Sequence, residues 1–195
     1  MIDDKIITAI RQNKAVPIIG AGVSYFYGYP NWRDLLIKLS VMYNANLNHD
    51  MINGKDYLQV AEALLQKGIN DRNLSSDQIK VFIEEFNTNV IECFKKGYDK
   101  NNENQNEINK IKRLNDIKFR TVITTNYDDL LESEIFKDNR YSVIYPSVGK
   151  ELSFDEYMPC IMKIHGDISE SKSIILTQSQ YYDFINSKGY FNSKI

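Results

Sequence analysis

Compact apolar runs alternate with longer stretches of helical spacing along this chain. The compact runs, each short enough to be a buried strand, occupy residues 15–19, 119–124, 141–145, 160–164 and 173–176. Apolar positions three and four residues apart predict helices at the start of the chain, after residue 32, twice between residues 57 and 90, after residue 128 and after residue 177. Because strands that alternate with helices form parallel sheets, the pattern predicts an α/β fold.

The polar segments refine this picture in two places. Ser75 or Ser76 is a candidate cap for the second central helix, and Thr177 is one for the last helix. Residues 95–110 are strongly polar, which indicates a solvated loop or a helix end that frays.

Composition narrows the class of protein. The chain has 195 residues, which suits one domain or a domain with a small insertion, and its 43% apolar and 26% charged residues are typical of globular proteins. A net charge of −2 argues against direct nucleic-acid binding or a membrane surface as partner, and no apolar run approaches the roughly 18 residues of a membrane span. Two distant cysteines and an acidic start favour a cytoplasmic location.

Three predicted strands end in polar residues. They end in Gly20-Ala21-Gly22-Val23-Ser24, in Thr124-Thr125-Asn126-Tyr127-Asp128 and in His165-Gly166-Asp167. Since the carboxyl ends of parallel strands share one edge, and ligands of open α/β sheets bind there, we expect these segments to form one site.

The glycine segment has two readings. Gly20 and Gly22 allow a sharp turn and the close approach of a phosphate, with backbone N–H groups and the Ser24 hydroxyl as donors. The plainer reading is a tight connection between strand and helix. Tyr25 stands where a dinucleotide fingerprint has its next required residue, and no P-loop lysine follows.

Asn126 and His165 are the candidate catalytic residues. An asparagine offers a donor and an acceptor for sugar hydroxyls or water, although Asn126 or Asp128 also suits a helix cap. His165 titrates near neutral pH and follows an apolar strand at the expected ligand edge. We expect His49 on the surface and Cys160 in the core, and find no spacing typical of a metal site.

The same residues resemble the sirtuin superfamily. The glycine segment and Gly28-Tyr29-Pro30-Asn31-Trp32-Arg33 are similar to its opening signature, and the Asn126 and His165 segments to its Thr-Gln-Asn-Ile-Asp and His-Gly motifs. The resemblance implies a Rossmann-like sheet that binds NAD and breaks its nicotinamide–ribose bond. It assigns the catalytic roles to Asn126 and His165, and NAD contacts to Gly20, Ala21, Gly22, Ser24, Trp32, Arg33, Thr125 and Asp128.

The departures from the family indicate a subgroup. Thr125 replaces the family's glutamine and Asn31 its aspartate, and two cysteines cannot build the four-cysteine zinc module of the protein deacylases. A helical insertion at about residues 50–115 lies between the first two motifs, as in sirtuin-like NAD hydrolases of prokaryotic antiviral defence. The family's later strand and glycine-rich loop do not occur before Ile195, so the resemblance predicts a domain that is cut short, with a sensor domain elsewhere.

Two functions follow as hypotheses. The first is a NAD glycohydrolase that releases nicotinamide and ADP-ribose as an abortive-infection effector, with NAD as substrate, no metal, and self-association into a homo-oligomer or with a partner protein. The alternative is a module that binds NAD or ADP-ribose without cleaving it.

Overall fold

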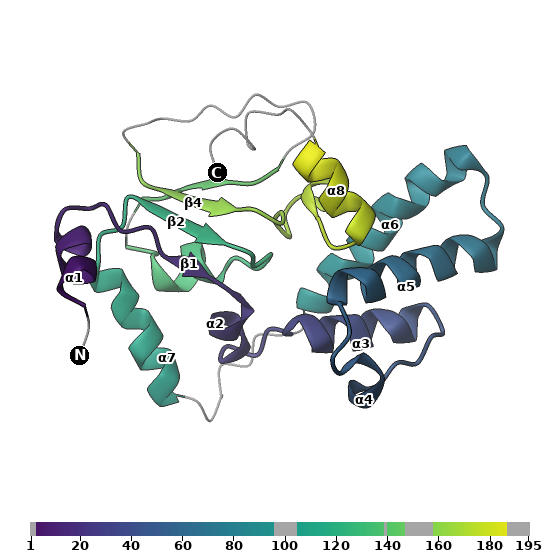
Figure 1. Ribbon diagram of the computed structural model, residues 1–195, viewed down its shortest axis with the longest axis horizontal. Helices are drawn as coiled ribbons and strands as arrows, with labels where there is room; N and C mark the ends of the chain where they lie inside the picture. Colours follow the sequence, from purple (N-terminus) through teal and green to yellow (C-terminus); the bar gives the residue numbers. More distant parts are fainter. Residues whose placement is uncertain (1–2, 96–104, 139, 147–157, 187–195) are drawn as a thin grey trace.

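The computed structural model describes residues 3–95, 105–138, 140–146 and 158–186. Within them, four strands form one all-parallel sheet in the order β1-β2-β4-β3 (Figure 1). The strands are β1 (Ile18–Ile19), β2 (Thr121–Thr124), β3 (Ser142–Ile144) and β4 (Cys160–Lys163). The predicted α/β fold with a Rossmann-like, parallel sheet is confirmed.

Two predicted strands differ from the structure. The first is reduced to β1, and the main chain before it contributes only the Pro17 carbonyl, which accepts from Ile123 N at 2.9 Å. The expected fifth strand at 173–176 is wrong. Ser173 ends a 3₁₀ turn (Ser171–Ser173), and Ile174 and Leu176 pack into a helical core instead of beside a strand.

The helices are α1 (Asp4–Arg11), α2 (Ala21–Tyr25), α3 (Trp32–Met42), α4 (His49–Ile52), α5 (Tyr57–Arg72), α6 (Ser76–Phe94), α7 (Gln105–Lys112) and α8 (Gln178–Asn186). Side chains next to the first turn cap the N-termini of several of these helices. The Asn31 side chain accepts from Asp34 N before α3, and Ser75 forms a capping box with Gln78 before α6. The helix expected after residue 128 is a single π-helical turn, Leu131–Ile135.

Among the described residues, two large apolar cores and one small cluster of Ile144, Cys160 and Met162 are buried. One large core joins α3, α5 and α6, where Gly68 allows close packing because a Cβ there would lie 2.4 Å from the Phe82 ring. The other large core covers one face of the sheet with the π-helical turn and α7, to which Ile108 belongs. The helices of the expected insertion therefore divide between the cores, and residues 96–104 of the polar segment lie outside the described residues.

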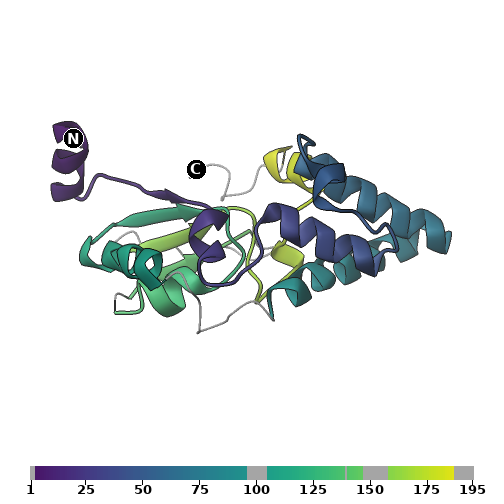
Figure 2. The ribbon, with the colours of Figure 1, turned by 90° about the horizontal axis from the view of Figure 1, so that it is seen from below.

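The two ends of the molecule differ in how tightly they pack. The helices α5 and α6 extend from the sheet on the side to which the strands point, whereas α1 stands away from the sheet (Figure 2). α1 has no buried residue, and its Ile6 is 52% exposed. The carboxyl ends of the strands therefore face the helical core of α3, α5 and α6, and not α1.

Candidate functional site

The three polar segments leave the sheet side by side. Ile19 pairs with Thr124, and Thr124 pairs with Lys163, so β1, β2 and β4 end at the same level. The residues that follow are Gly20, Thr125 and Ile164, next to Asn126 and His165. The prediction of a common edge is confirmed, and the parallel register is its physical reason.

A buried chain of hydrogen bonds connects the first two segments. Asn126 Nδ2 donates to Ser24 Oγ at 2.9 Å, and Ser24 Oγ donates to Asp128 Oδ1 at 3.0 Å. The three residues are at most 4% exposed. Asn126 Oδ1 is buried and has no hydrogen-bond partner in the structure. The amide is thus held by its nitrogen, while its oxygen remains available to accept from a hydroxyl or a water.

The main chain around Asn126 is fixed by threonine. Thr124 Oγ1 donates to the Ile19 carbonyl at 2.8 Å and accepts from Asn126 N at 3.0 Å. Asp128 Oδ1 accepts from Leu130 N at 3.2 Å, which closes a turn before Leu131–Ile135. The helix cap expected from Asn126 or Asp128 is wrong, because the N-cap of that π-helical turn is Leu130 and no side chain caps it. Burial raises the pKa of the Asp128 carboxyl, against the lowering effects of Ser24, the Leu130 N–H and Lys163.

His165 follows β4 at the same edge of the sheet, and its ring contacts aromatic side chains. Its ring meets Trp32 and Tyr181 edge-on, at centroid distances of 6.2 and 6.3 Å. Its Nδ1 is buried and has no hydrogen-bond partner in the structure, and burial lowers the pKa of the imidazole. A neutral imidazole at pH 7 is a proton acceptor, which is the form a general base needs.

Gly166 fixes the turn that carries His165. Its φ is +103°, and a Cβ there would lie 2.3 Å from the Ser173 carbonyl oxygen, so the position requires glycine. Gly20 has an extended conformation with φ −115°, and Gly22 lies within α2. The plainer reading of this segment, a tight connection between strand and helix, is confirmed, because Gly20 alone separates β1 from α2, and neither Gly20 nor Gly22 has a positive φ. A Cβ on Gly22 would meet nothing within 4 Å, so the space beside it is open.

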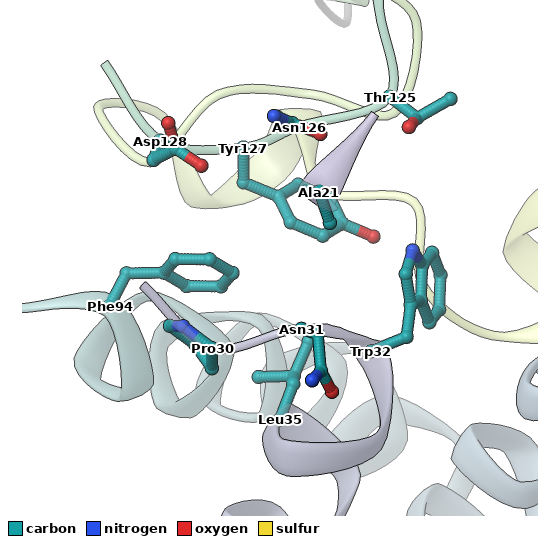
Figure 3. Close-up of a pocket in the computed structure, with 10 residues that line it drawn as sticks. All are labelled: Ala21, Pro30, Asn31, Trp32, Leu35, Phe94, Thr125, Asn126, Tyr127 and Asp128. Carbon is teal, nitrogen blue, oxygen red and sulfur yellow. The ribbon is translucent and has the colours of Figure 1, made fainter. Parts of the chain in front are cut away.

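A narrow crevice opens beside Asn126. Its walls come from the Asn126 segment, from the start of α3 and from the end of α6, and Figure 3 shows Tyr127 facing Phe94 and Trp32 across it. The crevice holds about 10 Å³, room for one water. Two larger cavities share Trp32 with it: one of about 330 Å³ reaches His165 and Tyr181, and one of about 540 Å³ reaches Arg33.

The predicted site residues do not all line one cavity, because His165 lines the cavity of about 330 Å³ and not the narrow crevice that Asn126 lines. Ala21, Trp32, Thr125, Asn126 and Asp128 line the narrow crevice together. Arg33 lines the cavity on the other side of Trp32, with a buried Nε that has no partner in the structure. His49 is exposed, as expected, and borders the same cavity, 3.9 Å from Asp34; Cys160 is buried, as expected.

A buried charge cluster lies behind the site and was not predicted from the sequence. Lys163, at the end of β4, is fully buried between Glu132 and Asp167. A lysine at the end of the otherwise apolar run Cys160–Ile164 was the signal available for it. Within the described residues no group of three or more His, Cys, Asp or Glu is arranged to hold a metal ion.

Comparison with known proteins agrees with this geometry. Residues 120–195, which contain Asn126, Asp128 and His165, match the family of SIR2-like domains. This segment is therefore similar to SIR2-like domains. The resemblance to sirtuins expected from the three motifs is thereby confirmed, and the glycine segment precedes the matched residues.

One curated protein that the chain is similar to is the NAD(+) hydrolase ThsA of Acinetobacter baumannii (strain 532279). It is 25% identical over 189 residues, and the alignment covers 93% of this chain but 33% of the relative. The chain therefore spans about a third of the length of that relative. Among the helices that the structure describes, none is both long and apolar enough to cross a bilayer.

Proposed function

We propose that this protein is a NAD glycohydrolase that cleaves NAD to nicotinamide and ADP-ribose. The observation that supports it best is the buried Asn126 amide, held by Ser24 with its oxygen unpartnered, on the same sheet edge as a neutral His165. Its similarity to a NAD(+) hydrolase and its SIR2-like segment favour the same chemistry.

The reaction needs few protein groups. The nicotinamide ring of NAD carries a positive charge and leaves as a neutral molecule when its bond to the ribose breaks, which places positive charge on the ribose. A water then bonds to the ribose carbon and loses a proton, so that NAD and water give nicotinamide, ADP-ribose and one proton. We assign the orientation of the ribose and water to Asn126 Oδ1 and the acceptance of the proton to His165.

The remaining contacts are assigned from their positions. The Ser24 hydroxyl already serves Asn126 and Asp128, so we assign the phosphates to the first main-chain N–H groups of α2, at Ala21 and Gly22. Trp32 and Arg33 border the cavities that flank the crevice, where the sugars and rings of a dinucleotide have room. Asp128 and Thr125 complete the nicotinamide end.

The test replaces the two proposed catalytic residues in the full-length protein. Asn126→Ala and His165→Ala should each lower the rate of nicotinamide release about 10²–10⁴-fold, because each removes a group that acts on the water or the ribose. The rate is measured by chromatography of NAD and its products. Asn115→Ala is the matched control, since the Asn115 amide bonds Asp138 at the surface; it should keep the parental rate.

Two outcomes oppose the proposal. Parental rates in both variants would contradict the catalytic roles of Asn126 and His165. Tight NAD binding by calorimetry, with no nicotinamide released by the intact protein, would favour the alternative of a binding or sensing module.

A cellular role and an assembly follow from the same proposal. We infer that the domain, with its helical insertion at about residues 50–115, is the effector of an antiphage system that depletes cytoplasmic NAD, and that it works as a homo-oligomer or with a sensor. In phage-infected bacteria, the full-length protein should lower NAD, and the Asn126→Ala protein should not. Light scattering of the purified protein tests the oligomer.

A further inference from the structure

Lys163 is a fully buried cation directly behind the proposed catalytic groups. Its Nζ donates to the Asp128 carbonyl at 2.7 Å and lies 2.5 Å from both Glu132 Oε1 and Asp167 Oδ2. A lysine side chain has three N–H donors, so these three acceptors use all of them. A buried lysine whose three donors are all used holds the segments of its three acceptors in fixed positions relative to one another.

The three acceptors belong to the two segments that carry the catalytic groups. Asp128 lies two residues after Asn126, and Glu132 is on the π-helical turn that continues the same segment. Asp167 lies two residues after His165 and also accepts from Ser169 N at 2.8 Å. A second link runs parallel to the lysine, because Ile168 N donates to the Tyr127 carbonyl at 3.1 Å. The lysine therefore joins the Asn126 segment to the His165 turn.

The charges of the cluster make the connection strong. Burial by itself would lower the pKa of Lys163, but the carboxylates of Glu132 and Asp167 outweigh it and raise the pKa, so the lysine stays charged at neutral pH. Glu132 Oε2 is buried without a hydrogen-bond partner in the structure, so Glu132 contacts the cluster through Oε1. Removal of the lysine would leave carboxylates buried and unpaired.

We propose that Lys163 is a positioning residue for NAD cleavage, which holds Asn126 and His165 at the separation that the reaction needs by joining their two segments. The proposal rests on the proposed function. Lys163 does not line the crevice or the two cavities beside it, so it acts through the main chain at Asp128 and through Asp167. Small displacements of catalytic groups are enough to lower a rate about 10²-fold.

The experiment separates positioning from stability in the full-length protein. Lys163→Met removes the links but leaves unpaired buried carboxylates, and this variant can fail to fold. The double variant Lys163→Met/Glu132→Gln removes one of those charges and recovers stability while the links stay absent. Lys172→Met is the matched control, because Lys172 pairs with Glu84 on the surface, where both side chains are more than half exposed.

The expected result is a split between turnover and binding. The double variant should unfold within a few degrees of the parent, keep KM for NAD within about threefold, and lose about 10²-fold in kcat, because the groups assigned to the phosphates and those bordering the flanking cavities, Ala21, Gly22, Trp32 and Arg33, lie on α2 and α3 and not on the joined segments. Lys172→Met should match the parent in all three. If the double variant has both the unfolding temperature and the kcat of the parent, the proposal is overturned, because Lys163 would then act through stability alone.

A second measurement does not depend on activity. Amide hydrogen exchange at Asn126, Leu130 and Ile168 should be at least about tenfold faster in the double variant than in the parent, because these amides belong to the joined segments. Parental exchange at all three would show that Lys163 does not hold the segments together. A parental protein that releases no nicotinamide would contradict the proposed function, and the exchange rates would still decide whether Lys163 makes the connection.

Discussion

At the scale of single residues, the site depends on which atoms are left without partners. The Ser24 hydroxyl accepts from Asn126 and donates to Asp128, so it fixes which end of the Asn126 amide faces the crevice. His165 has aromatic neighbours and a buried Nδ1, so its imidazole is kept neutral. An oriented acceptor and an uncharged base on one edge are what a hydrolysis by water requires.

The pH dependence of the rate follows from His165. Burial lowers its pKa below the usual 6.5, so the imidazole that we propose as the base is neutral at pH 7 and can accept a proton. We expect kcat/KM for NAD to be flat between pH 7 and about 8.5 and to fall only below about pH 6.5, in a profile measured from pH 5. His165→Gln should remove that step.

The same shift links His165 to stability. The unfolded chain takes up the proton at a higher pH than the folded protein does, so the free energy of unfolding should decrease as the pH falls below about 6.5.

For the pH profile of the rate, a rate that rises only above pH 7 would contradict the role of His165 as the base.

At the scale of elements, α6 carries a wall of the site on a well-packed helix. Phe86 in α6 is fully buried against Tyr43, with ring centroids 5.3 Å apart, and Phe94 at the end of the same helix lines the crevice. The position of Phe94 therefore depends on how α6 packs on α3 and α5.

A pair of substitutions in α6 measures this packing. Phe86→Ala should lower the free energy of unfolding by about 3–5 kcal/mol, because it removes a ring from a filled core. Val81→Ala is the control on the same helix: its side chain is 70% exposed, so its effect should stay within about 0.5 kcal/mol. Unfolding in urea measures both, and similar values for the two variants would show that α6 is not packed as described.

At the scale of the whole molecule, the crevice lies between the two cores. Leu35 and Phe94 reach it from the helical core, and Thr125 and Asn126 reach it from the sheet. A dinucleotide that occupies the larger cavities beside the crevice and reaches Asn126 contacts both parts, so its binding should couple them.

Binding of ADP-ribose, the proposed product, tests this coupling in the full-length protein. Because a ligand stabilises the state that binds it, amide exchange should slow both at residues 31–35 of α3 and at residues 125–128. Protection confined to one of the two parts would place the ligand outside the crevice. The amides of residues 14–16, before β1, serve as an internal control and should not change.

The sequence by itself determined the strand ends and their chemistry. The apolar runs at 119–124 and 160–164 predict buried strands, and strands that alternate with helices pair in parallel. Because parallel strands end at the same edge of the sheet, the residues that follow them, Asn126 and His165, lie at that edge. Only the tertiary structure decided which groups meet there. Ser24 and Asn126 are 102 residues apart in the sequence. Lys163 pairs with one carboxylate from the π-helical turn and one from the turn after β4, and Ile174 and Leu176 pack among helices rather than in a strand. Each of these depends on the partner that the folded chain supplies, which no local pattern of residues specifies.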